Sequence, residues 1–152
     1  MPISDLCSKK PVTVQSRESV RNAARLMKKK HVGTLIVTKG DGKNARPIGV
    51  ITDRDLVVKV MAKGKKDTKC KVKDVMTSKL VSAKKGIGVY EAIELMQKKE
   101  VRHLIVVDKS DQLCGIISTD DLVQMLGQEI SGIGKLYESQ VKHESQAQVH
   151  AH

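Results

Sequence analysis

Apolar residues follow the same order of spacings twice along the chain. A short strand comes first, at residues 12–14 and again at 81–83. A helix follows over 18–30 and 88–99, with apolar residues at positions i, i+3, i+4 and i+7. This spacing places one apolar stripe along each helix. Two further strands and a closing helix complete each copy, so the pattern predicts an α/β protein built from two β-α-β-β-α units.

In the first copy the two further strands are predicted at 34–38 and 47–52 and the closing helix at 54–62. In the second copy the strands are predicted at 103–108 and 113–118 and the closing helix at 120–127. After the second copy the apolar pattern weakens. Residues from Ser131 favour a short amphipathic helix, and the polar composition beyond Lys142 favours a flexible tail. The chain is therefore predicted to contain a first repeat at 1–63, a lysine-rich linker at 64–71 and a second repeat at 72–130. A C-terminal helix with a tail is predicted at 131–152.

The two copies align residue by residue. Met27 and Met96 differ by 69 positions, and this offset holds from the first strand to the end of the second. After the glycine-rich turn at 39–46 the offset becomes 66, as between Gly49 and Gly115. A turn of this composition can absorb a three-residue insertion. The constant register over most of the chain indicates a true internal repeat.

Each copy ends its last strand with a hydroxyl residue and places an aspartate three residues later. The pairs are Thr52 with Asp55 and Ser118 with Asp121. Free backbone N–H groups at a strand-to-helix junction favour a phosphate, and the aspartate can accept bonds from the paired hydroxyls of a ribose. The same residues can instead cap the helix and stabilise its dipole. The spacing leaves both interpretations open.

Positive charge is concentrated in two segments. The chain of 152 residues carries 28 Lys and Arg against 17 Asp and Glu, a net charge of +11. Residues 59–79 hold two aspartates and eight lysines, which are Lys59, Lys63, Lys65, Lys66, Lys69, Lys71, Lys73 and Lys79. Arg17, Arg21, Arg25 and Lys28 form a basic ridge at helical spacing. This charge favours a polyanion such as RNA or DNA, although a solvated linker explains it as well.

Other residue types argue against several classes of protein. Cys7, Cys70 and Cys114 form neither a disulfide framework nor a zinc pattern, and no set of residues suggests a catalytic or metal site. Tyr90 and Tyr137 are the only aromatic residues, which disfavours binding single-stranded nucleic acid by stacking. No apolar run resembles a signal peptide or a membrane span. We therefore expect a soluble cytoplasmic protein that is not an enzyme and does not contact membranes.

Four motifs in a common order carry a resemblance to a known family. The Asp-Val-Met-Thr opening lies at 74–77 and, more loosely, at 5–8, and the Ala-x-x-Leu-Met helix lies at 23–27 and 92–96. Val-Arg-His-Leu lies at 101–104, and Gly-apolar-x-Ser/Thr-x-x-Asp lies at 49–55 and 115–121. With them, residues 1–130 resemble a pair of cystathionine β-synthase (CBS) domains, the Bateman module. The resemblance implies two repeats that associate through their sheets with pseudo-twofold packing and leave two ligand clefts.

The resemblance also implies a function and partners. Such modules are regulatory and commonly bind AMP, ADP or ATP, less often S-adenosylmethionine, and none of these is a required cofactor. Two modules usually form a homodimer. The output then passes to a regulated partner such as an effector enzyme, or nucleotide occupancy tunes binding to nucleic acid.

Nucleotide-binding residues are carried over by position. The resemblance implies that the ribose is bound by Asp55 and Asp121. It implies phosphate contacts from the hydroxyl and basic residues Thr52, Ser118, Arg54, Arg102 and His103. It implies adenine contacts from residues of the first strands, Thr13, Val14, Ser82 and Ala83. Gly33 and Thr34 stand in the first copy where Arg102 and His103 stand in the second. We therefore expect two related clefts with unequal affinities.

Overall fold

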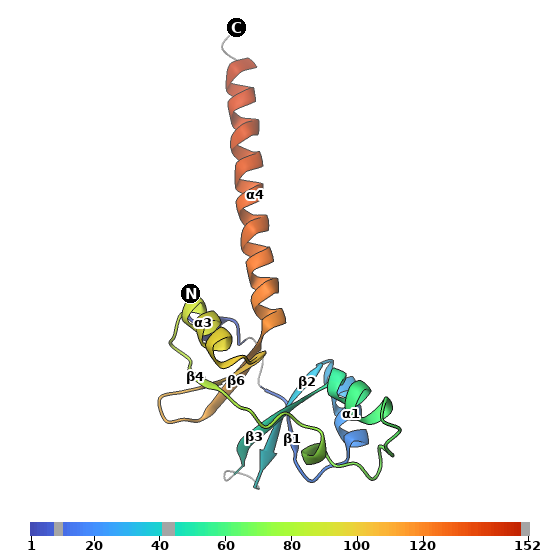
Figure 1. The fold of residues 1–152 in the computed structure, drawn as a ribbon. Helices are drawn as coiled ribbons and strands as arrows, with labels where there is room; N and C mark the ends of the chain where they lie inside the picture. The colour runs from blue at the N-terminus through green and yellow to red at the C-terminus, as the bar shows by residue number, and fades with distance from the viewer. Residues whose placement is uncertain (8–10, 41–44, 150–152) are drawn as a thin grey trace. The chain divides into compact units, whose positions relative to one another are not determined.

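The computed structural model describes residues 1–7, 11–40 and 45–149, and it divides into two compact units. The first unit, Met1–Ile117, holds nearly all of both repeats. The second unit, Ser118–His152, is dominated by one helix. Figure 1 follows the chain through these elements.

The first repeat contains a three-stranded sheet and the helix that covers it. Strands β1 (Thr13–Gln15), β2 (Thr34–Lys39) and β3 (Arg46–Thr52) lie in the order β1-β2-β3, with α1 (Val20–Lys30) between the first two. β1 is parallel to β2, and β2 is antiparallel to β3. The repeat closes with α2 (Asp53–Asp55), which continues into the π-helix η3 (Leu56–Met61). The predicted α/β architecture is therefore confirmed for this copy.

The second repeat follows the same plan. Strands β4 (Ser82–Lys84), β5 (His103–Val107) and β6 (Leu113–Ser118) form a sheet in the order β4-β5-β6, and α3 (Val89–Lys99) joins β4 to β5. β4 is parallel to β5, as β1 is to β2. Every strand begins within one residue of its predicted start, because the apolar runs that define the strands are short and bounded by polar residues.

Strand β2 is buried on both faces because the two sheets meet. Leu35 and Val37 point toward α1 and join the core of the first repeat. Ile36 lies on the opposite face and packs with Ile105 and Val107 of the second sheet. Neighbouring side chains of a strand point to opposite faces. The repeats therefore associate through their sheets, as the resemblance implied.

The two repeats exchange their opening segments. Pro2 forms a bridge with Gly88 of the second repeat, and Ser19 of the first repeat forms a bridge with Lys71. These four residues are equivalent pairs at the repeat offset of 69 positions. The short 3-10 helices η1 (Ile3–Asp5) and η4 (Val72–Asp74) follow Pro2 and Lys71, so each caps the copy to which it does not belong by sequence. The packing of each repeat is complete only with the other's opening segment.

The C-terminal region differs from the prediction. A closing helix at 120–127, a separate helix from Ser131 and a flexible tail beyond Lys142 were expected, whereas α4 is one helix from Thr119 to Val149 (Figure 1). The expected C-terminal helix is present, but its separation from the closing helix and the tail before Val149 are wrong; residues 150–152 lie outside the described part. The segment contains no proline, and each of its three glycines costs only about 1 kcal/mol, which weakens the helix without ending it. No helix of the described residues combines the length and apolar character needed to cross a membrane.

Candidate functional site

The first hydroxyl–aspartate pair forms a capping box at the end of β3. The backbone N–H of Thr52 donates to Oδ2 of Asp55 at 2.9 Å, and the backbone N–H of Asp55 donates to Oγ1 of Thr52 at 3.1 Å. The Thr52 hydroxyl also lies 3.1 Å from the same carboxylate oxygen. Each side chain thus binds a backbone group that the start of a helix leaves without a partner. The bonds that the capping interpretation requires are therefore present at this pair.

The second pair repeats this geometry at the start of α4. The backbone N–H of Ser118 donates to Oδ2 of Asp121 at 2.7 Å, and its hydroxyl donates to the same oxygen at 2.6 Å. The backbone N–H of Asp121 donates to Oγ of Ser118 at 3.2 Å. The chain therefore builds one local structure twice, from equivalent residues in different surroundings.

The two aspartates differ at their second oxygen. Nζ of Lys59 lies 2.8 Å from Oδ1 of Asp55 and donates to the carbonyl of Val75 at 2.8 Å. Both Asp55 oxygens are therefore engaged, and the side chain is only 14% exposed. The second-copy counterpart of Lys59 is Met125, which carries no charge, and Asp121 is exposed. A ribose hydroxyl at Asp55 would share an oxygen with Lys59, whereas Asp121 has no such competitor from the equivalent position.

Equivalent residues also meet where β2 and β5 begin. Oγ1 of Thr34 lies 3.5 Å from Nε2 of His103, and the two residues occupy the same place in their repeats. Both are half-buried. A close approach between equivalent positions is the signature of a pseudo-twofold axis passing between the strands. The structure thus places His103 at the junction of the repeats.

A carboxylate lies beside the first-copy position that is equivalent to Arg102. Gly33 occupies it, and a Cβ added there would lie 2.9 Å from Oδ2 of Asp53. The backbone N–H of Asp53 donates to the Gly33 carbonyl at 2.9 Å, which holds this carboxylate in place. The sequence had suggested only that Gly33 lacks a charge. The Asp53 carboxylate was missed, because its nearness to Gly33 depends on how β3 turns into α2.

The remaining candidates of the first copy, Thr13, Val14 and Arg54, belong to β1 and α2. Thr34 of β2 lies opposite Thr52 of β3, and Thr13 of β1 lies opposite Ile36, two residues further along β2. The three threonines are therefore near the same end of the sheet. Val14 is buried in the core, and Arg54 is exposed on α2. β1 lies at a sheet edge, where one row of backbone groups has no strand partner and can meet a ligand.

The equivalent residues of the second copy behave alike. Ser82 is exposed and Ala83 is buried, and both belong to β4, which also lies at an edge of its sheet. Backbone recognition of a base is therefore open to either copy. Among the described residues, no group of three or more His, Cys, Asp or Glu side chains could hold a metal ion.

Comparison with known sequences finds relatives along most of the chain. A family model described as "CBS domain" matches residues 3–62 and 72–127. An uncharacterized protein of Methanopyrus kandleri is 28% identical over 123 residues, which are 81% of this chain and 61% of that protein. The CBS domain-containing protein YhcV of Bacillus subtilis is 32% identical over 132 residues, 86% of this chain and 89% of that protein. The chain therefore spans less than two thirds of the first relative and most of the second.

Solved structures share the fold. A CBS domain protein from Pyrobaculum aerophilum complexed with AMP gives a TM-score of 0.69 at 26% identity, covering 80% of this chain and 90% of that one. The CBS domain pair of protein MJ0100, in complex with 5'-methylthioadenosine and S-adenosyl-L-methionine, gives 0.70 at 25% identity, covering 85% and 98%. A hexameric CBS-CP12 protein from bloom-forming cyanobacteria gives 0.70 at 28% identity, covering 81% and 69%.

Proposed function

The chain belongs to the CBS domain family, and from that premise we propose that it is a regulatory module that binds an adenine nucleotide, AMP, ADP or ATP. The observation that carries the proposal is the doubled junction, in which Thr52–Asp55 and Ser118–Asp121 each place a hydroxyl and a carboxylate at the start of a helix. The complexes of two similar structures with AMP and with S-adenosyl-L-methionine support an adenosyl ligand.

The chemistry of the junction suits the ribose and phosphate of such a ligand. One carboxylate oxygen of Asp121 holds the capping box, and within the described residues the other has no hydrogen-bond partner. That oxygen can accept a bond from a ribose hydroxyl while the box stays intact. The N–H groups of the first helical turn favour the negative charge of a phosphate.

We expect the two sites to bind with different affinities. At the first site Lys59 competes for Asp55, and Asp53 places a negative charge beside Gly33 where the second copy has Arg102. A nucleotide phosphate is repelled by a carboxylate, so Asp53 should weaken the site that uses Asp55.

Calorimetry tests the proposal directly. Titration of the purified chain with AMP, ADP and ATP should give saturable binding with two unequal affinities for at least one nucleotide. Asp121→Ala should remove the tighter class and Asp55→Ala the weaker one. Asp74→Ala is the matched control, because Asp74 also caps a short helix, through Lys71, but lies outside both junctions. Absence of binding by all three nucleotides at millimolar concentration would overturn the proposal.

We propose that the module acts on an effector enzyme, which its nucleotide-bound form regulates. A homodimer is the expected working state. Both statements rest on the family, since several relatives with this fold are assemblies or parts of larger chains. Native mass spectrometry of the purified chain would give the oligomeric state and any retained ligand in one measurement.

A second candidate function is favoured by the placement of the linker. The Cys70 carbonyl accepts a bond from the backbone N–H of Val20 at 3.0 Å, and Nε of Arg21 lies 2.8 Å from Asp67. These contacts hold the lysine-rich linker beside the start of α1, so the two basic segments of the sequence form one surface. We propose that this surface binds a polyanion such as RNA or DNA as an additional function.

Salt dependence distinguishes the two functions. Binding to RNA or DNA through this surface should weaken steeply with added salt, because each neutralised phosphate releases counterions. Replacing Lys65, Lys66 and Lys69 with Gln should reduce the slope of that dependence, whereas the affinity for AMP should change little. A salt-independent affinity for RNA, or none at low salt, would refute the second candidate.

A further inference from the structure

Helix α4 exposes a row of large apolar side chains. Its seven members are between 46% and 69% exposed, and we name them the α4 seam: Val123, Leu126, Ile130, Ile133, Leu136, Tyr137 and Val141. Over residues 119–144, for which burial is described, the buried residues of the same helix are Leu122 and Met125, in its first two turns. Beyond them, the described part of α4 carries its apolar residues on an open surface.

The spacing of the seam is that of a helix that pairs with another helix. Val123, Leu126, Ile130, Ile133 and Tyr137 follow one another at intervals of three, four, three and four residues. Apolar residues at these intervals return to one side every seven residues, which keeps them facing a single partner helix.

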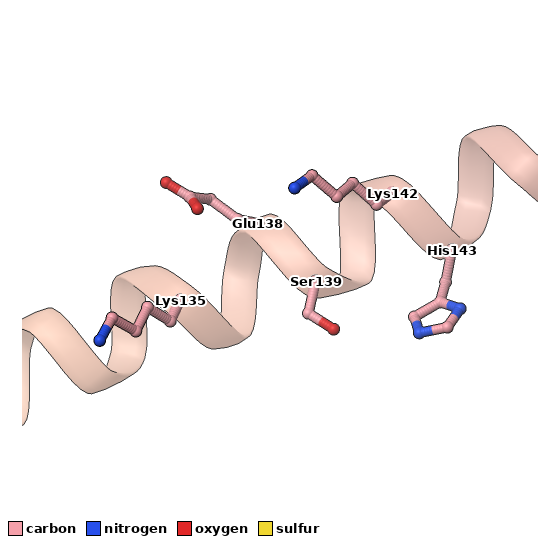
Figure 2. Close-up of a pocket in the computed structure, with 5 residues that line it drawn as sticks. All are labelled: Lys135, Glu138, Ser139, Lys142 and His143. Carbon is pink, nitrogen blue, oxygen red and sulfur yellow. The ribbon is translucent and has the colours of Figure 1, made fainter.

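The opposite side of α4 is polar. Figure 2 shows Lys135, Glu138, Ser139, Lys142 and His143 along one stretch of the helix. At about 3.6 residues per turn, Lys135, Glu138, Ser139 and Lys142 lie away from the seam, whereas His143 lies on the side of Leu136. The alternating charges are spaced three and four residues apart, as in helices that face water. The helix is therefore divided into one apolar and one polar side, as an interface helix is.

The glycines of α4 weaken the helix, so its stability depends on packing. Gly127 and Gly134 lie beside the seam, and a Cβ added at either would meet nothing within 4 Å. Glycine is among the poorest helix formers, and most helical stability in proteins comes from packing an amphipathic face. A long helix with these residues gains little from propensity, so it depends on a partner for the seam. Small residues beside the seam also let a partner helix approach closely.

The charge of α4 argues against a membrane surface or a nucleic acid as this partner. Its five acidic and two basic residues give a net charge of −3, although the whole chain carries +11. Anionic lipids and phosphates would be repelled. Glu129 lies along one edge of the seam, and Gly127 and Gly134, which carry no charge, lie along the other edge. An identical helix can therefore approach without like charges in contact.

The size of the seam fits self-association. Seven side chains of this type, about two thirds exposed, offer roughly 500 Å² of apolar surface on each copy. Two copies would together remove about 1,000 Å², which is the lower bound for a specific interface. We propose that the α4 seam pairs with the same seam of a second copy of this chain. This gives the expected homodimer a contact surface, and it does not depend on nucleotide binding.

The test measures the mass of the full chain in solution without nucleotide. Light scattering after size exclusion should give the wild type at least twice its 16.7 kDa chain mass at micromolar concentration. The double variant Ile130→Lys with Ile133→Lys should halve the wild-type mass, because lysine places charge in the seam. Gln128→Lys, on the polar side of the same helical turn, is the matched control and should keep the wild-type mass.

Folding is checked by circular dichroism. Lysine forms helices at least as well as isoleucine, and both seam positions are exposed, so the folded double variant should lose no buried contact within its own chain. A wild-type monomer, or a double variant that keeps the wild-type mass, would overturn the proposal. A monomer that co-sediments with phosphatidylcholine–phosphatidylserine vesicles would assign the seam to a lipid surface instead.

Discussion

Replacing Gly49 with alanine should destabilise the protein by disturbing the contact between β3 and the segment that opens the second repeat. A Cβ at this position would lie 2.8 Å from Sδ of Met76 and 2.8 Å from the carbonyl oxygen of Thr77. The methionine side chain can rotate away. The carbonyl cannot move without breaking the bridge between Val50 and Thr77, whose two N–H···O bonds measure 2.9 and 2.8 Å.

Two independent considerations give the size of the effect. Forcing an extra carbon into a packed site costs about 1–3 kcal/mol. Losing the two backbone hydrogen bonds of the Val50–Thr77 bridge costs about 0.5–1.5 kcal/mol each, or about 1–3 kcal/mol together. These are alternative outcomes of one clash, so they are not added. We expect Gly49→Ala to lower the free energy of unfolding by about 2 kcal/mol, and the melting temperature of a chain of this size by about 4–8 °C.

Urea unfolding followed by circular dichroism measures this change, with Gly86→Ala as the control. Nothing lies within 4 Å of a Cβ at Gly86, so its substitution should change stability by no more than about 0.5 kcal/mol. Gly115→Ala should fall between the two, because the atoms nearest to its Cβ belong to the Cys7 side chain, at 3.0 Å. If Gly49→Ala and Gly86→Ala unfold at the same urea concentration, the reasoning from the repeat contact is refuted.

Three further outcomes are expected. Asp121→Ala should lower the free energy of unfolding by about 1 kcal/mol through loss of its capping box, seen as a lower melting temperature. His31→Gly should raise it by about 1 kcal/mol because His31 ends α1 at a φ of 54°, while Lys30→Gly should lower it. Arg21 donates a hydrogen bond to the Asp67 carboxylate and lowers the pKa of Asp67. The stability from this ion pair is fully present above the ordinary aspartate pKa of about 3.9, and it is lost as pH falls through the lowered pKa of Asp67 in the folded chain. In carbon NMR titration, Arg21→Gln should therefore move the Asp67 midpoint up toward that ordinary value; an unmoved midpoint would exclude the ion pair.

The local elements follow from the sequence because each depends on neighbours along the chain. Strand β2 needs only its own apolar run, and α1 only its 3.6-residue stripe with Ser19, whose hydroxyl accepts a bond from the Asn22 N–H at its start. The capping boxes at Thr52 and Ser118 are similarly local, since hydroxyl and aspartate are three residues apart. The length of α4 could not be predicted this way, because glycine weakens a helix without setting its end.

Contacts between distant residues depend on the packing of the whole. The repeat in the sequence predicts two similar units, but it does not say that their opening segments change places, because an opening segment fits either copy equally well by composition. Lys59 reaches both Asp55 and the Val75 carbonyl only once that exchange has placed Val75 beside η3.

The site shows the same division. Thr52, Asp55, Ser118 and Asp121 can be selected from the sequence alone, because hydrogen bonds between residues three apart require no knowledge of the fold. Their inequivalence comes from tertiary structure. The turn from β3 into α2 brings the Asp53 carboxylate against Gly33, some twenty residues earlier in the chain, and a distance of that kind is set by three-dimensional packing.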